Sequence, residues 1–227
     1  MSARTAASKH DPDRQRRRRA DYGSVRLSDR DVRLLALIGA QYAITVEQLA
    51  RLIGRRERTA RWLRDRWRQA GWIESRQLLA AGPSLVWLTG TGARVAGSPY
   101  RTWRPNPGLA AHIEAVTEVR LLLDQQLRLG SWRCERELAK ALLAEGRPHL
   151  PDAVIETGDE TVAVEVELTL KSRARLEAVL EELGRSYDQV WYFAPPKLQP
   201  TLRSLAAAAP WQNISVYTYP PRLSELA

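Results

Sequence analysis

The stretch that decides the fold of the C-terminal half is PDAVIETGDETVAVEVELTLK, residues 151–171. Apolar and polar residues alternate along it, and successive side chains of a β-strand point to opposite faces. The alternation predicts one strand over residues 152–156 and a second over residues 162–168. The dipeptide Gly158-Asp159 lies between them and is typical of a two-residue hairpin turn. We therefore expect two adjacent antiparallel strands.

The turn also sets the register of the two strands. A two-residue turn pairs Thr157 with Glu160, so that Asp152 lies opposite Glu165 with Cβ atoms about 5 Å apart. Carboxylates this close repel each other unless a cation or a proton lies between them. Glu167 follows on the same face, and three acids offer hard oxygen ligands for Mg²⁺ or Mn²⁺. The alternative is a solvent-facing polar strand, on which acids are common.

Helical and strand patterns around this hairpin complete the element order αβββαβαβ. We expect helices and strands in turn over residues 109–129 (helix), 131–138 (strand), 172–185 (helix), 189–193 (strand), 197–209 (helix) and 213–217 (strand). A mixed sheet flanked by helices buries a core well at this length. The expected fold class is therefore α/β, with mixed α and β elements.

Three helical patterns and a hairpin pattern follow one another in the N-terminal half. We expect Ser28 to cap a first helix that ends at Tyr42, and Thr45 to cap a second over residues 46–53. A third pattern covers residues 56–70, and two short strands lie on either side of a Gly-Pro turn. Three helices, a tight turn and a hairpin predict a winged helix-turn-helix.

The third of these helices, within RRERTARWLRDRWRQAG (residues 55–71), is the most basic element of the chain. Its apolar stripe leaves the opposite face lined with arginine, which binds DNA phosphates or guanine edges in the major groove. The alternative is an ordinary solvated face. Trp62 flanks the basic face, where it could pack under the wing or lie against the DNA backbone, and core packing is the role that we expect. The candidate DNA-binding residues are Arg55, Arg56, Arg58, Arg61, Arg64 and Arg68.

The distribution of charge supports a division of the chain into two functional halves. The net charge of +9 is made up of +5 over residues 1–27, +8 over residues 28–104 and −4 over residues 105–227. This asymmetry favours a nucleic-acid-binding half joined to a half with another task. We expect a disordered basic arm (1–27), a winged helix (28–96), a Pro-rich linker (97–108) and a second domain (109–227). The arm either contacts DNA or only adds solubility.

Several classes of protein are disfavoured. No apolar run is long enough to span a membrane, and the arginine-rich N-terminus is unlike a secretory signal, so we expect a cytoplasmic protein. The single cysteine, Cys134, excludes an internal disulfide. No catalytic Ser-His-Asp pattern, P-loop or dinucleotide motif is present. We expect His112 to be structural and His149 to contact a phosphate or orient its loop.

Pro151-Asp152, followed by a strand that ends in Glu165-Val166-Glu167, resembles the PD-(D/E)XK nuclease superfamily. The resemblance implies that Asp152 and Glu165 hold a divalent metal, Mg²⁺ or Mn²⁺. The lysine of the motif is replaced by Glu167, a departure that some restriction enzymes of the superfamily share. Lys171 is a weaker match for the missing cation. Glu118 loosely matches a helical acid that some members add to the site.

The arrangement of both halves, with Ala111-His112-Ile113-Glu114 on a helix before PDAVIE and VEVELTLKS, resembles the replication-relaxation family of actinobacterial plasmids and integrative elements. The resemblance covers roughly residues 28–220 and implies a role in plasmid replication or transfer. Two hypotheses stay open. In one, Asp152, Glu165, Glu167 and Lys171 form an endonuclease site that nicks or cleaves DNA.

In the other hypothesis, the nuclease-like domain has no activity and serves dimerisation or partner docking for a DNA-binding regulator. The replacement of the motif lysine by Glu167 favours this alternative. Double-stranded DNA is the expected partner in both, no membrane is expected in either, and a homodimer is one further option.

Overall fold

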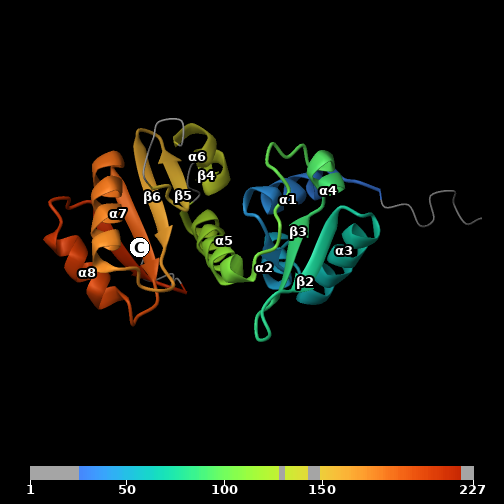
Figure 1. Cartoon of the computed structure of the whole chain (residues 1–227). Coiled ribbons are helices and arrows are strands. Elements are labelled where there is room, and N and C mark those ends of the chain that lie inside the picture. The colour runs from blue at the N-terminus through green and yellow to red at the C-terminus, as the bar shows by residue number, and fades with distance from the viewer. Residues whose placement is uncertain (1–25, 128–130, 143–148, 221–227) are drawn as a thin grey trace, which may run out of the picture.

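The computed structural model describes residues 26–127, 131–142 and 149–220. These residues form a mixed α/β fold with two sheets, one of three strands and one of five (Figure 1). Most of the basic arm expected over residues 1–27 lies outside the described residues. Over those residues, no helix combines the length and the apolar character that crossing a bilayer requires.

The N-terminal half packs its helices on a small antiparallel sheet of strand order β1-β3-β2. Its core is formed by residues such as Leu35, Ile38, Leu63 and Trp67, all buried. The two-residue β1 and the short α4 were not expected. The elements are α1 (Asp29–Ala40), β1 (Ile44–Thr45), α2 (Val46–Leu52), α3 (Glu57–Gln69), β2 (Ile73–Gln77), β3 (Ser84–Leu88) and α4 (Gly90–Val95).

Local sequence signals place the helix starts in this half. The Ser28 side chain accepts a hydrogen bond from the Asp31 backbone N–H, and the Asp31 carboxylate accepts one from the Ser28 N–H. Thr45 and Gln48 form the same reciprocal arrangement at the start of α2. Both caps satisfy backbone N–H groups that have no partner inside a helix, so both predicted helix starts are confirmed.

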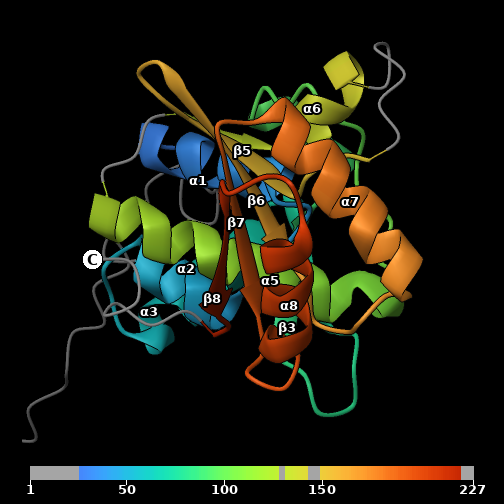
Figure 2. The ribbon, with the colours of Figure 1, turned by 90° about the vertical axis from the view of Figure 1, so that its left-hand side faces the viewer.

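The C-terminal half is a five-stranded sheet of order β4-β5-β6-β7-β8, antiparallel from β4 to β6 and parallel from β6 to β8. Helix α5 covers one face, and α7 and α8 cover the other (Figure 2). The elements are α5 (Pro107–Leu127), β4 (Ser131–Cys134), α6 (Glu135–Leu142), β5 (Ala153–Thr157), β6 (Glu160–Val166), α7 (Arg173–Ser186), β7 (Gln189–Ala194), α8 (Gln199–Ala208) and β8 (Ile214–Thr218).

The predicted hairpin register is confirmed. The pairs run from Thr157 with Glu160 to Ala153 with Val164, and Asp152 and Glu165 are the next two residues in that register. One prediction is wrong. The strand expected over residues 131–138 ends at Cys134, and a helix follows. Two glutamates in the first turn of α6 favour that helix through its dipole.

Helix α5 lies between the two halves and packs on both (Figure 1). On its N-terminal side, Ile113 belongs to one apolar cluster with Leu85 and Trp87. Gln48 donates a hydrogen bond to the backbone oxygen of Glu114 at 2.9 Å. The segment before α5 is packed as well, since Trp103 contacts Trp87 edge to face with ring centroids 5.9 Å apart. The expected linker is therefore part of a packed boundary.

Candidate functional site

The acids that the sequence places on one strand face are buried. Glu165 and Glu167 lie on β6 and just beyond its end, and they are 3% and 4% exposed. Ala163, which shares their face by alternation, packs against α7 and α8. The alternative of a solvent-facing polar strand is therefore wrong. Buried carboxylates are costly unless they are paired or hydrogen-bonded, so the partners of each acid define the site.

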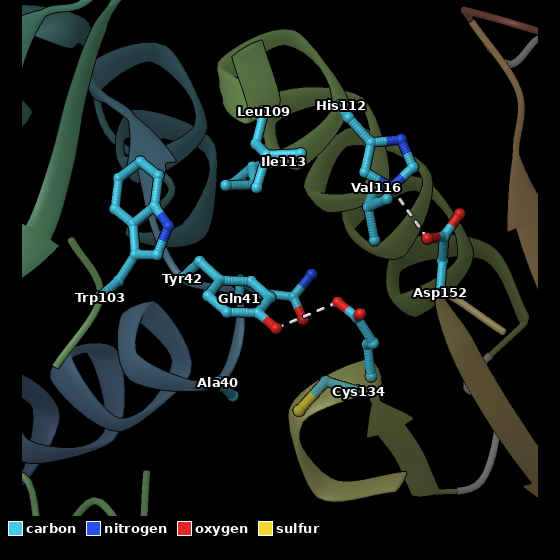
Figure 3. Close-up of a pocket in the computed structure, with 11 residues that line it drawn as sticks. Ala40, Gln41, Tyr42, Trp103, Leu109, His112, Ile113, Val116, Cys134 and Asp152 are labelled. Carbon is cyan, nitrogen blue, oxygen red and sulfur yellow. Dashed lines mark hydrogen bonds and ion pairs between the residues drawn. The ribbon is translucent and has the colours of Figure 1, made fainter. Parts of the chain in front are cut away.

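Asp152 is held by two partners at the edge of the hairpin ladder. Its Oδ2 accepts a hydrogen bond from the backbone N–H of Val166 at 2.7 Å. Its Oδ1 lies 2.8 Å from Nε2 of His112, which projects from α5 (Figure 3). Asp152 therefore connects the helix to the second strand of the hairpin, immediately beyond the last regular pair of that ladder.

Glu165 has a strongly perturbed environment. Burial raises the pKa of its carboxyl to about 7, and the nearby charge of Asp152 contributes to that rise. His149, whose Nε2 lies 2.7 Å from Glu165 Oε1, opposes part of the rise, as does Lys171. Burial and the neighbouring acid therefore both strengthen the binding of a proton by Glu165, as the register predicts.

Glu167 and Lys171 form an ion pair with Nζ and Oε2 2.6 Å apart. Lys171 reaches Glu167 from the chain segment after β6, so the lysine that the sequence offers as a weak match for the missing cation lies beside one of the acids. Tyr192 also belongs here, since it pairs with Glu165 in the parallel register of β6 and β7. Its buried hydroxyl has no hydrogen-bond partner among the described residues.

The two histidines are the site residues that sequence reasoning missed. His112 was expected to be structural, yet it contacts Asp152. Burial lowers the pKa of His112, but Asp152, Glu165 and Glu135 outweigh that effect and raise it overall. His149 was expected to contact a phosphate or orient its loop, and it contacts Glu165. Its position three residues before Asp152 was the one available signal.

Glu118, the loosely matched helical acid, does not contact these acids. It forms an ion pair with Arg51 of α2 and accepts a hydrogen bond from Gln48 at 3.5 Å. Its role in the structure is to join the two halves. The Arg51 side chain is exposed, and solvent screens exposed charges, so this ion pair contributes little to stability.

The donor set fits a divalent cation only in part. Asp152 and Glu165 offer carboxylate oxygens, the ligands that Mg²⁺ and Mn²⁺ prefer. Within residues 26–127, 131–142 and 149–220, however, no three His, Cys, Asp or Glu side chains are arranged to hold a metal. Mg²⁺ is commonly bound by one or two carboxylates with water and substrate phosphates. The two acids supply the number of carboxylates that this mode requires.

Helix α3 presents its arginines to solvent as the sequence predicts. Ala60, Leu63 and Trp67 are buried against the rest of the half. Two arginines of the expected set pair with acids in the described part of the chain, Arg61 with Glu57 and Arg64 with Asp65. All members of the set are exposed except the half-buried Arg64: Arg55, Arg56, Arg58, Arg61, Arg64 and Arg68.

The expectation for Trp62 is wrong. Its side chain lies on the arginine face of α3 and is 60% exposed. The guanidinium of Arg66 lies over its ring, 5.6 Å from the centroid. The ring belongs to the exposed face because Trp62 directly precedes Leu63, and adjacent helical positions point in different directions.

Comparisons with known proteins add no assignment. No protein-family model matches the chain, and no curated protein matches it. Among solved structures, the chain is similar to protein VC1899 from Vibrio cholerae, with 11% sequence identity and a TM-score of 0.33. The match covers 85% of this chain and 53% of VC1899, so the chain spans about half the length of that protein. A likeness this weak transfers neither a fold nor a function.

Proposed function

We propose that this protein binds double-stranded DNA through α3, with the β2–β3 hairpin as the wing of a winged helix-turn-helix. The observation that carries the proposal is the exposed arginine face of α3. Arg55, Arg56, Arg58 and Arg68 have no acidic partner within the described ranges, so their charge is available to phosphates. A helix buried on one side and basic on the other suits the major groove.

The salt dependence of DNA affinity tests this proposal. Changing Arg58, Arg61 and Arg68 together to Ala should reduce the slope of log K against log salt by up to about one unit for each phosphate that the protein no longer contacts. The matched control changes three exposed arginines of α7, Arg173, Arg175 and Arg185, to Ala, which removes the same charge from the other half.

Fluorescence anisotropy with a labelled duplex at several salt concentrations measures both triple variants. We expect the α7 variant to keep the parent's slope. Equal slopes for the parent and the α3 variant would remove α3 from the binding surface.

We propose as a second function the metal-dependent cleavage of a phosphodiester bond at Asp152 and Glu165. The specific observation in its favour is the pair of acids that the hairpin register places side by side, of which Glu165 is buried and has a raised pKa. Such perturbed groups gather at functional sites. Asp152 and Glu165 would hold Mg²⁺ or Mn²⁺, which polarises a bound phosphate and lowers the pKa of bound water.

The neighbouring side chains have defined tasks in this proposal. His112 and the Val166 N–H orient Asp152. Glu167 acts as a further ligand or as general base, and Lys171, bonded to it, supplies positive charge beside the phosphate. The position of the motif lysine is occupied by Glu167, so we expect weak activity.

Nicking of supercoiled plasmid with Mn²⁺ tests the second function. Asp152→Asn should abolish nicking and leave the affinity for duplex DNA unchanged, because α3 and Asp152 belong to different halves. Nicking by the variant at the parent's rate would exclude this site. A parent without nicking would favour the alternative function, a DNA-binding regulator whose nuclease-like half serves dimerisation or docking.

The cellular role that fits both functions is DNA replication or transfer of a plasmid or mobile element in the cytoplasm, as the resemblance to the replication-relaxation family implies. A homodimer is the assembly that the regulator alternative predicts. Sedimentation of the purified protein at micromolar concentration measures its oligomeric state. A monomer would contradict the homodimer that this alternative predicts.

A further inference from the structure

A cavity of about 300 Å³ lies at the boundary between the two halves. Its walls come from the end of α1, the segment before α5, α5 itself and the start of α6 (Figure 3). Leu109, Ile113 and Val116 of α5 form an apolar side, and the rings of Tyr42 and Trp103 form another. Ligand pockets of proteins begin at about this volume and have mostly apolar and aromatic walls.

The cavity meets the candidate metal site at one residue, Asp152. Asp152 and His112, which hydrogen-bond to each other, both line it. A molecule bound at Asp152 can therefore extend into the cavity from that side.

The charges of the cavity indicate which part of a substrate enters it. Its lining contains the carboxylates of Glu135 and Asp152, and His112 is the only basic side chain among the lining residues. A phosphate inside would be repelled. A neutral, planar group is favoured, because it can lie against the rings of Tyr42 and Trp103 and meet the polar side chains of Gln41 and Glu135 at its edge.

We propose that this cavity receives one unpaired base of a DNA strand, while the adjoining phosphate lies outside it, at the divalent cation that Asp152 and Glu165 would hold. The proposal rests on the proposed DNA binding and cleavage, and it names their substrate class. A base inside a duplex is stacked and cannot enter a pocket, so the strand must be single-stranded or unpaired at that point. The preferred substrate is then a duplex with an unpaired nucleotide, bound by α3 on its paired part.

The test compares two labelled duplexes of the same sequence, one fully paired and one with a single unpaired adenine, by fluorescence anisotropy with Ca²⁺ present. Stacking of one base on aromatic side chains should make the parent bind the second duplex about 5- to 100-fold more tightly. Leu109→Trp places a bulky aromatic ring at the cavity. Leu109 is 47% exposed, so the substitution does not disturb the core. We expect it to abolish the preference and keep the affinity for the paired duplex.

The control is Ala207→Trp, which adds the same ring to an exposed position of α8, across the sheet from α5. It should keep the preference of the parent. Equal affinity of the parent for both duplexes, or a preference retained by Leu109→Trp, would overturn the cavity proposal alone. Failure of the parent to bind either duplex would instead contradict the proposed function.

Discussion

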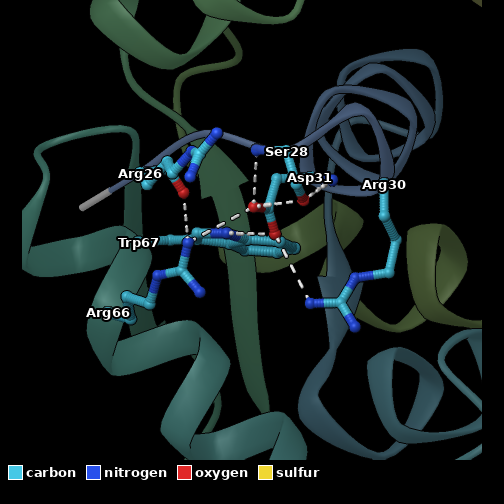
Figure 4. A network of polar contacts seen from close by, with 6 residues as sticks. All are labelled: Arg26, Ser28, Arg30, Asp31, Arg66 and Trp67. Atoms are coloured by element: carbon cyan, nitrogen blue, oxygen red, sulfur yellow. Dashed lines mark hydrogen bonds and ion pairs between the residues drawn. The ribbon is translucent and has the colours of Figure 1, made fainter.

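Two buried carboxylates, Asp31 in the N-terminal half and Glu165 in the C-terminal half, have opposite surroundings. Asp31 accepts hydrogen bonds from the backbone N–H and the hydroxyl of Ser28, at 3.1 and 2.7 Å, and from Trp67 Nε1 at 3.2 Å (Figure 4). Arg30 and Arg66 lie within ion-pair distance of it. Each of these neighbours donates a hydrogen bond or carries a positive charge.

Glu165 is equally hidden from solvent, but among the described residues its carboxyl has one hydrogen-bond partner, His149, and a second acid lies beside it. Its surroundings disfavour the charged form. A carboxylate supplied with donors on all sides serves stability, whereas one buried against another acid is destabilised and needs a cation or a proton. The difference separates an acid with a structural role from the acid that we propose as a metal ligand.

The largest expected effect is the loss of Asp31. Asp31→Ala should lower the free energy of unfolding by about 2–4 kcal/mol, because it removes the capping interaction and leaves the buried Trp67 N–H without an acceptor. Urea denaturation measures the change. Ser28→Ala, which loses only the cap, should cost about 1 kcal/mol. Equal costs for the two variants would show that the bond to Trp67 contributes nothing.

The surroundings of Glu165 should make the stability of the folded protein depend on pH. Its folded pKa, about 7, lies above its ordinary value of 4.5, so the folded state binds the proton more tightly. The stability from this group is present below pH 4.5 and is lost as the pH rises through 7, a decrease on the order of 1–3 kcal/mol. The raised pKa of His112 acts in the same direction above pH 6.5.

Glu165→Gln isolates that contribution, since it keeps the shape of the side chain and cannot ionise. With EDTA present, the free energy of unfolding of the parent, measured with urea over a pH range from about 5 to 8, should fall more steeply than that of the variant. Parallel profiles would mean that Glu165 is not buried against Asp152. Added Mn²⁺ should stabilise the parent more at about pH 8 than at about pH 5.5, because only the ionised acids bind it.

The smallest expected effect concerns Tyr192, a buried polar group of the acidic region without a partner in the described chain. Tyr192→Phe should raise the free energy of unfolding by up to about 1 kcal/mol, since a buried hydroxyl that makes no hydrogen bond costs stability. Thermal unfolding with EDTA measures this. A loss of stability in the variant would instead show that the hydroxyl has a partner in solution.

Much of this molecule could be predicted from local patterns. The two capping boxes, the apolar stripe of α3 and the Gly158-Asp159 turn each act over a few residues, and each lies where it was expected. Turn geometry alone sets the hairpin register, which is why the sequence could predict that Asp152 and Glu165 oppose each other. The change from β4 to α6 was missed because a stretch as short as residues 131–138 fits both the two-residue period of a strand and the period of a helix.

The sequence by itself determined the helix starts, the hairpin, the register of its acids and the basic face of α3, because these depend on neighbours close along the chain. Only the tertiary structure decided that the acids are buried, that His112 and His149 meet them, and that a cavity opens beside Asp152. Those features need α5, packed between two halves, to bring residues 40 positions apart into contact. Burial depends on which helices cover a sheet face, and no pattern within the strand contains that information.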